Sequence, residues 1–285
     1  MKIIGCNNAS GVGELGLKQN IDTLMEKYPH YKIDRVVEPV FKLQEEPSLL
    51  RHFESVFNLN QQLAKSCQAE LEKGETLLNI IGDHSAGIGT VAATSSISQQ
   101  LGVIWIDAHS DINTEKTTPS GNIHGMPLAS LLNLTENELN NILFEGPKMK
   151  PEHLVYIGLR DVDPGEQDVL DRLNILYFTY ETVMQIGFFE VLTQTFNRLA
   201  MCDAVHISLD MDSMNPEIVT AVSVPVEDGF TPDEVEYILQ NLLMNLPIRS
   251  IDIAEYNPAY DVEFKSLEIL NDLIESIGGF YEAQS

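Results

Sequence analysis

The stretch VIWIDAHSD, residues 103–111, joins a short apolar run to three polar side chains in alternate positions. An apolar run of this length, rich in β-branched and aromatic residues, is typical of a buried strand. Asp107, His109 and Asp111 follow it directly. In an extended segment, side chains at positions i, i+2 and i+4 point to the same side. The stretch therefore predicts a buried strand that ends in three converging polar groups.

Similar apolar runs recur along the chain and alternate with longer segments of helical periodicity. This alternation predicts βα units and a mostly parallel sheet, and the nearly continuous hydrophobicity of the runs predicts strands covered on both faces. The fold class that follows is α/β, with three layers in the order α/β/α. We expect strands at residues 2–4, 76–81, 103–106, 155–159, 175–178, 205–209 and 250–253. We expect helices at residues 50–73, 88–100, 127–134, 188–200, 232–244 and 265–277.

Length and composition favour one domain. The 285 residues, 44% of them hydrophobic, are enough for a large core, although the length would also fit two smaller domains. No linker rich in proline, glycine or serine and no low-complexity tract interrupts the chain. We therefore expect a single domain over residues 1–285.

The charge of the chain is strongly acidic. Seventeen lysines and arginines face 43 aspartates and glutamates, which gives a formal net charge of -26. Such a charge repels nucleic-acid phosphates and anionic membranes, so we expect neither as a partner. The charge has two interpretations: it keeps the protein soluble, or it attracts a cationic substrate or metal ions into an acidic cleft. Composition alone does not separate these two interpretations.

Two further features bear on the cellular compartment. The apolar run at the N-terminus is too short for a signal peptide, and no segment has the length needed to cross a bilayer. Cys6, Cys67 and Cys202 are widely spaced and form no CxxC pair, which is typical of reduced core thiols. We expect a soluble cytoplasmic protein.

Polar residues follow three other apolar runs in the same way. His84 comes after LLNIIGD, Asp210 and Asp212 come after VHISL, and Glu255 comes after IRSIDIA. In open α/β sheets, ligands bind outside the carboxyl ends of the strands. These side chains should therefore meet at one edge of the sheet.

Together these positions supply two imidazoles and four carboxylates: His84, Asp107, His109, Asp111, Asp210 and Asp212. Four carboxylates in one cleft repel each other and take up protons unless divalent cations neutralise them. Two such cations balance four carboxylates, and this oxygen-rich set suits Mn²⁺ better than a structural Zn²⁺ site. A water held between two ions becomes a hydroxide nucleophile near neutral pH, which indicates hydrolysis. A single copy of such a motif is commonly a turn or a helix cap; three copies at three strand ends favour metal binding.

The order and spacing of six motifs resemble those of the arginases, from about residue 78 to residue 258. The motifs are GDHS, DAHSDINT, SGNIHG, YIGLRDVDPGE, SLDMD and IAEYNP. The resemblance implies an arginase-like fold, two Mn²⁺ ions per subunit, and hydrolysis of L-arginine to L-ornithine and urea by a bridging hydroxide. Arginases form trimers or hexamers, so the resemblance also implies a homo-oligomer. The wider ureohydrolase family, which includes agmatinases and formimidoylglutamases, shares the metal pattern.

The resemblance also implies roles for individual residues. Asp107 and Asp210 would bridge the ions, with His84 and Asp111 completing one ion and His109 and Asp212 the other. Three residues would act in catalysis: Asp111 and His124 in proton transfer, and Glu255 in orienting the guanidinium group. Six would bind the amino-acid end of the substrate: Asn113, Thr118, Ser120, Asn122, Asp163 and Glu166. Agmatine lacks the carboxylate and would leave donors unpaired, so these residues favour arginine.

Four residues depart from the arginase pattern. Ile81 replaces a glycine, Asn215 an acid, Ser223 a glycine and Val224 a threonine that lies near the guanidinium group in the family. The departures leave two alternative hypotheses open. One is an agmatinase or another guanidino-compound ureohydrolase, and the other is a metal-binding but catalytically inactive arginase-like protein.

Overall fold

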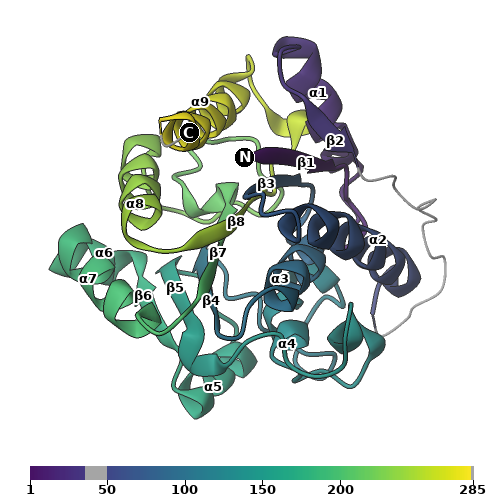
Figure 1. Ribbon diagram of the computed structural model, residues 1–285, viewed down its shortest axis with the longest axis vertical. Helices are drawn as coiled ribbons and strands as arrows, with labels where there is room; N and C mark the ends of the chain where they lie inside the picture. The colour runs from purple at the N-terminus through teal and green to yellow at the C-terminus, as the bar shows by residue number, and fades with distance from the viewer. Residues whose placement is uncertain (36–49, 284–285) are drawn as a thin grey trace.

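The structure is a computed structural model that describes residues 1–35 and 50–283. In these residues the strands form one parallel sheet in the order β2-β1-β3-β8-β7-β4-β5-β6 (Figure 1). The strands are β1 (Lys2–Cys6), β2 (Ile33–Arg35), β3 (Leu77–Ile81), β4 (Leu101–Ile106), β5 (Leu154–Leu159), β6 (Leu176–Thr179), β7 (Ala204–Asp210) and β8 (Ile248–Ala254). The helices are α1 (Asn20–Lys27), α2 (Phe53–Leu71), α3 (Gly87–Ser96), α4 (Pro127–Leu131), α5 (Pro164–Leu173), α6 (Tyr180–Ile186), α7 (Phe188–Leu199), α8 (Pro232–Asn245) and α9 (Lys265–Glu282).

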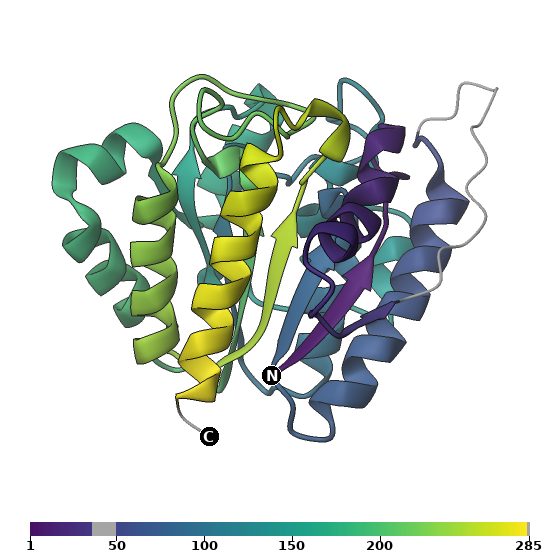
Figure 2. The same cartoon turned by 90° about the horizontal axis from the view of Figure 1, so that it is seen from above.

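Helices cover both faces of the sheet, which confirms the predicted three-layer α/β/α class (Figures 1 and 2). Alternate residues of each strand enter different cores, because successive side chains of a strand point to opposite faces. Ile104 and Ile106 of β4 pack with apolar residues of α1, α7, α8 and α9. Val103 and Trp105 pack in a separate cluster on the other face, beside α3, α4 and α5. Because both faces are covered, the strands have the continuous hydrophobicity seen in the sequence.

Four elements were not predicted, and several predicted helices are shorter than expected, among them α2 (predicted at 50–73), α3 (88–100) and α4 (127–134). The predicted strands correspond to the observed strands other than β2, which is three residues long and contains two charged residues. Helices α1, α5 and α6 were missed. The helix expected at 127–134 ends at Leu131. Cys6, Cys67 and Cys202 are buried and form no disulfide, as expected. None of the described helices has both the length and the apolar character to cross a membrane.

The sheet brings the predicted site together because the four strands that precede the site residues are neighbours in it. β3, β8, β7 and β4 are adjacent and parallel, so their carboxyl ends share one edge of the sheet. Ile106 lies opposite Leu209 in the register of β4 and β7, and Asp107 and Asp210 are the residues that follow this pair. The carboxylates therefore face each other as a result of strand register.

A buried ion pair lies deeper between the sheet and α3. His206 Nε2 is 3.0 Å from Asp252 Oδ2, and its Nδ1 is 2.9 Å from the hydroxyl of Thr94. Asn79 donates to the other oxygen of Asp252 at 2.7 Å. His206 is fully buried, and its polar atoms face these partners. His206 is therefore a histidine of the core, away from the candidate metal ligands.

We expect Lys148→Met to lower the free energy of unfolding by about 2 to 4 kcal/mol, because three carbonyl oxygens lose a charged donor. The Lys148 ammonium group is 3% exposed and donates to the carbonyls of Asn140, Phe144 and Gly146. Urea denaturation measures the change. Lys150→Met, at a side chain that is 61% exposed, is the control and should change stability by less than about 0.5 kcal/mol. Equal effects of the two substitutions would contradict this assignment.

Candidate metal centre and active site

His84 is held in place from two sides beyond the end of β3. Its ring stacks on Trp105 with the centroids 4.1 Å apart, and its Nε2 lies 2.8 Å from the hydroxyl of Ser208. A hydrogen bond at one ring nitrogen fixes the tautomer and leaves the other nitrogen free to coordinate. The preceding residue, Asp83, accepts from the amide of Gly11 at 2.7 Å and from that of Ser85 at 3.0 Å, so the whole turn is rigid.

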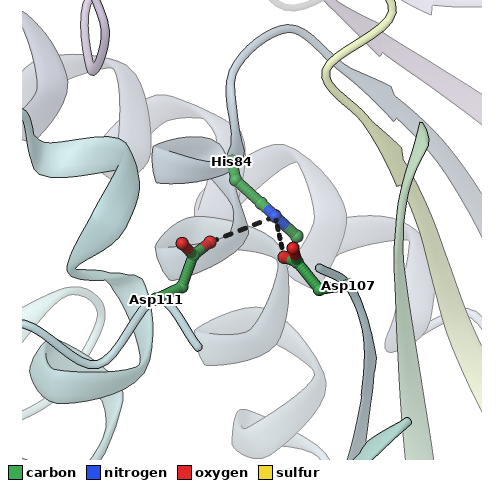
Figure 3. Close-up of side chains that lie close together, drawn as sticks. All are labelled: His84, Asp107 and Asp111. Atoms are coloured by element: carbon green, nitrogen blue, oxygen red, sulfur yellow. Dashed lines mark ion pairs between the residues drawn. The ribbon is translucent and has the colours of Figure 1, made fainter. Parts of the chain in front are cut away.

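The Nδ1 atom of His84 faces three carboxylates, and Figure 3 shows two of them, those of Asp107 and Asp111. It lies 3.1 Å from Asp107 Oδ2, 3.2 Å from Asp111 Oδ2 and 3.0 Å from Asp210 Oδ2. All four side chains are buried. His84, Asp107 and Asp111 form one group whose candidate ligand atoms all lie within 4.8 Å of each other.

A second group lies on the other side of Asp107. His109 Nδ1 is 3.0 Å from Asp212 Oδ2 and 3.6 Å from Asp107 Oδ1. Asp107, His109 and Asp212 again bring one ligand atom each within 4.8 Å. Asp107 therefore presents one oxygen to each group. Its orientation is fixed because Trp105 Nε1 donates to Oδ2 at 2.9 Å and the amide of His109 donates to Oδ1 at 2.7 Å.

When cations are absent, protons on the histidines and aspartates of this cluster offset the negative charge of its carboxylates. Burial lowers the pKa of His84 and of His109, but the surrounding carboxylates outweigh burial and hold both pKa values well above the usual range. Burial and the charge of Asp107 raise the pKa of Asp111 to about 7. Burial also raises the pKa of Asp210 and of Asp212. Divalent cations would replace these protons, so metal binding should release protons.

The donor set fits two divalent cations. His84 Nδ1 and Asp111 Oδ2 are buried and lie 3.2 Å apart, yet neither makes a well-formed hydrogen bond to the described residues, so both are available to a cation. Asp111 also has a left-handed backbone, with φ of 50°, which costs free energy for a residue other than glycine. Carboxylate oxygens and imidazole nitrogens, with no thiolate, are ligands suited to Mn²⁺.

Glu255 connects His84 to His124. Its Oε1 accepts the amide hydrogen of His84 at 2.9 Å and lies 3.2 Å from His124 Nδ1. Its Oε2 is buried and has no hydrogen-bond partner among the described residues. Burial lowers the pKa of His124, but the hydrogen bond and the charge of Glu255 outweigh burial and raise it to about 9.

The metal groups border a cavity of about 190 Å³. The predicted catalytic residues and the predicted substrate residues all line it: Asp111, His124, Glu255, Asn113, Thr118, Ser120, Asn122, Asp163 and Glu166. His109, Asp210 and Asp212 also line it, whereas His84 and Asp107 are buried behind them. Residues from four strand ends, those of β4, β5, β7 and β8, and from the 113–124 segment therefore converge on one space.

At the predicted amino-acid end of the cavity, two side chains are already bonded. Asn113 Nδ2 donates to Asp163 Oδ2 at 2.9 Å, which leaves one amide hydrogen for a ligand. Glu166 accepts from the amides of Ile112 at 3.0 Å and Asp163 at 2.9 Å. The second of these bonds belongs to the capping box that begins α5. Glu166 thus also holds the 107–113 segment against α5.

Of the four departures from the arginase pattern, only Val224 lines the cavity. Its side chain is 38% exposed. Ile81 is buried in an apolar cluster at the end of β3, where its side chain is accommodated. Asn215 accepts from the amide of Glu217 at 2.8 Å and so closes a turn. Ser223 accepts from Asn257 Nδ2 at 3.0 Å, which joins its loop to the segment that follows β8.

Three residues that support the site were not predicted from the sequence: Trp105, Ser208 and Asp83. Trp105 packs, and it also donates to Asp107. Ser208 could have been found, because it shares a strand face with Asp210 two positions later. Asp83 could not, since its partners Asn8 and Gly11 are distant in the sequence.

Comparisons with known proteins agree with this geometry. The model of the Arginase family matches residues 12–278. The arginase of Bacillus subtilis (strain 168) is 37% identical over 230 residues, covering 81% of this chain and 78% of that protein. The arginase of Bacillus caldovelox is 38% identical over 233 residues, with the same coverage. The structure of Entamoeba histolytica arginase in complex with L-ornithine superposes with a TM-score of 0.90 at 29% identity, covering 98% of both chains. The chain belongs to the arginase family and is a hydrolase of guanidino C–N bonds.

Proposed function

We propose that the protein is a binuclear manganese enzyme that hydrolyses L-arginine to L-ornithine and urea. One observation carries the proposal: two groups of metal-ligating side chains share Asp107 and lie beside a cavity lined by every predicted substrate residue. His84 and Asp111 would hold one ion, His109 and Asp212 the other, and Asp107 and Asp210 both. When bound, the two ions supply Lewis acidity, which makes water nucleophilic near neutral pH.

Glu255 is suited to orient the guanidinium group. Its buried Oε2 has no hydrogen-bond partner, and a planar guanidinium donor pairs well with a carboxylate. Its other oxygen is held by the amide of His84, so the carboxylate has a fixed direction. The substrate would thus be aligned relative to the same turn that carries a metal ligand.

His124 is suited to supply a proton to the leaving amine. The pKa of about 9 keeps its imidazole protonated at neutral pH when cations are absent, and it lines the cavity beside Glu255. We assign Asp111 to the transfer of a proton from the attacking water, because its carboxylate lies in both the metal group and the cavity wall.

The opposite end of the cavity is suited to an α-amino acid. Asn113 and Ser120 offer donors for a carboxylate, with Thr118 and Asn122 beside them, and Asp163 offers an acceptor for an ammonium group. The relative from Entamoeba histolytica was solved with L-ornithine, an α-amino acid. The net charge of -26 would favour a cationic substrate. We propose L-arginine rather than agmatine on these grounds.

The assembly of the protein follows from the family alone. We propose a homo-oligomer, either a trimer or a hexamer, which light scattering after size-exclusion chromatography would measure. The single domain over residues 1–285 and the cytoplasmic location stay predictions.

The test is urea release from L-arginine and from agmatine, with the manganese content of the same sample measured. We expect two Mn²⁺ ions per chain, loss of activity on chelation, and kcat/KM at least tenfold higher for arginine. Faster turnover of agmatine would favour the other ureohydrolases and overturn the substrate. Full metal occupancy without urea from either compound would favour a catalytically inactive protein. Fewer than two ions would contradict the binuclear centre.

A further inference from the structure

Arg160, in the motif GLRD, lies beneath the turn that carries Asp212, and none of the roles assigned above uses it. The hydrogen bonds of its side chain within the described residues all go to backbone carbonyl oxygens, at 2.7 to 3.4 Å. The six acceptors are the carbonyls of Gly158, Asp212, Ser213, Met214, Val226 and Glu227. One guanidinium group therefore joins the end of β5 to two stretches of the 211–229 segment.

The shortest of these bonds goes to a predicted metal ligand. Arg160 Nη2 donates to the carbonyl of Asp212 at 2.7 Å, and its Nη1 donates to the next carbonyl, of Ser213, at 3.2 Å. The carboxylate of Asp212 points the other way, toward His109 Nδ1 at 3.0 Å. The backbone of Asp212 is thus fixed from below while its side chain faces the metal centre.

The surrounding backbone is built to admit the guanidinium group. Gly229 has a φ of 122°, and a Cβ there would lie 2.7 Å from Arg160 Nη2. Gly158, with φ of 106°, lies at an irregularity in the pairing of β5 with β6, just before Arg160. Both positions require glycine for conformation and for space. Gly229 therefore leaves room for the guanidinium group, whereas a Cβ at Gly158 would lie 2.7 Å from the ring of Phe230.

The charge of Arg160 also acts on the centre. Burial lowers the pKa of Arg160, and the charges of Asp212, Asp107 and Asp210 oppose this effect. The guanidinium group remains charged, as arginine does in proteins. It thus places a permanent positive charge behind carboxylates that would otherwise repel each other.

We propose that Arg160 is a positioning residue that fixes Asp212, and with it the His109–Asp212 side of the metal centre. The inference rests on the proposed binuclear centre. The guanidinium group of Arg160 serves one group only, because its hydrogen bonds reach Asp212 and its neighbours and none reaches the turn of His84 or the 107–111 segment. The 107–111 segment is reached only by the backbone amide of Arg160, which donates to the carbonyl of Ala108 at 2.9 Å and is kept when the side chain is changed. Loss of the Arg160 side chain should therefore weaken the binding of the two metal ions to different extents.

The test is a Mn²⁺ titration of the chelator-treated, full-length protein, followed by calorimetry and by electron paramagnetic resonance. Arg160→Lys keeps the charge, but its compact ammonium group cannot span the carbonyls at both 212–214 and 226–227. We expect the Kd of one ion to rise at least tenfold and that of the other to stay within twofold. Arg198→Lys is the matched control: Arg198 also donates to a carbonyl, that of Asn174, at the end of α5. It should change neither Kd.

Testing Arg160→Lys in a second variant separates a positioning role from a general loss of protein stability. Asp212→Asn removes the ligand through which Arg160 is proposed to act, so Arg160→Lys should weaken metal binding no further in that variant. The inference would be overturned by any of three results: that Arg160→Lys raises the Kd of both ions equally, raises the Kd further in the Asp212→Asn background, or changes neither Kd. A wild-type protein that binds fewer than two ions would instead overturn the proposed function, so the two failures are distinguishable.

Discussion

Replacing Asp107 with asparagine is expected to lower kcat/KM for L-arginine by about 10⁴-fold, or about 5 kcal/mol of transition-state stabilisation. Asparagine keeps the shape of the side chain but replaces one oxygen with an amide group that donates instead of accepting. Asp107 is the residue common to both metal groups, with a different oxygen toward each. We therefore expect both Mn²⁺ ions to bind at least tenfold more weakly, measured by metal analysis of the purified variant.

The control for this substitution is another acid at the same site. Asp161 Oδ2 lies 3.9 Å from His109 Nε2 and lines the cavity, but its side chain is 64% exposed and it belongs to neither metal group. Asp161→Asn should keep two ions and change kcat/KM by less than about tenfold, because an exposed charge is screened by solvent. An Asp107→Asn protein that retains two ions and more than 1% activity would contradict a bridging role for Asp107.

The sheet could be predicted because its strands carry a signal that does not depend on distant residues. Leu101–Ile106 is buried throughout, as a strand covered on both faces should be. The candidate ligands could be predicted for a related reason. A parallel sheet aligns the ends of its strands, so polar residues directly after separate apolar runs must meet.

The missed elements lack such a local signal. β2 has the sequence IDR, and it is a strand because β1 offers it an open edge, with Ile3 opposite Ile33. Helix α5 begins at a capping box of Asp163 and Glu166, and both residues were interpreted as substrate contacts. The pattern of an acid followed by a glutamate three positions later is a helix start signal, so α5 could have been predicted.

Backbone conformation at the site was beyond prediction from local propensity. Asp111 and Glu255 both have left-handed φ values, 50° and 65°, which residues other than glycine rarely adopt. Each is held there by tertiary bonds: the amide of Glu255 donates to the carbonyl of Gly82 at 2.8 Å, and the carbonyl of Asp111 accepts from Leu128 at 3.0 Å. Such strain persists where surrounding contacts fix the chain, and it occurs at functional sites.

Glu255→Gln should lower kcat/KM for L-arginine by about 10³-fold, because a neutral amide group replaces the carboxylate proposed to pair with the guanidinium group. The substitution keeps an acceptor of the same shape for the amide of His84. Two Mn²⁺ ions should remain bound, since Glu255 belongs to neither metal group. Glu227→Gln, at an exposed side chain, is the control and should leave kcat/KM unchanged. Loss of metal in the Glu255 variant would contradict a role in orienting the substrate.

The same substitution should change the titration of His124 in the chelator-treated protein. Glu255 raises the pKa of His124 to about 9, so in the variant it should fall toward the ordinary imidazole value of about 6.5. Because the folded pKa exceeds the unfolded value, the pair stabilises the fold fully below about pH 6.5 and loses this contribution as the pH rises through about 9. Stability of the variant should therefore depend less on pH across this window. Histidine proton NMR measures the pKa and urea denaturation measures the stability; a His124 pKa that stays at about 9 in Glu255→Gln would show that Glu255 does not control it.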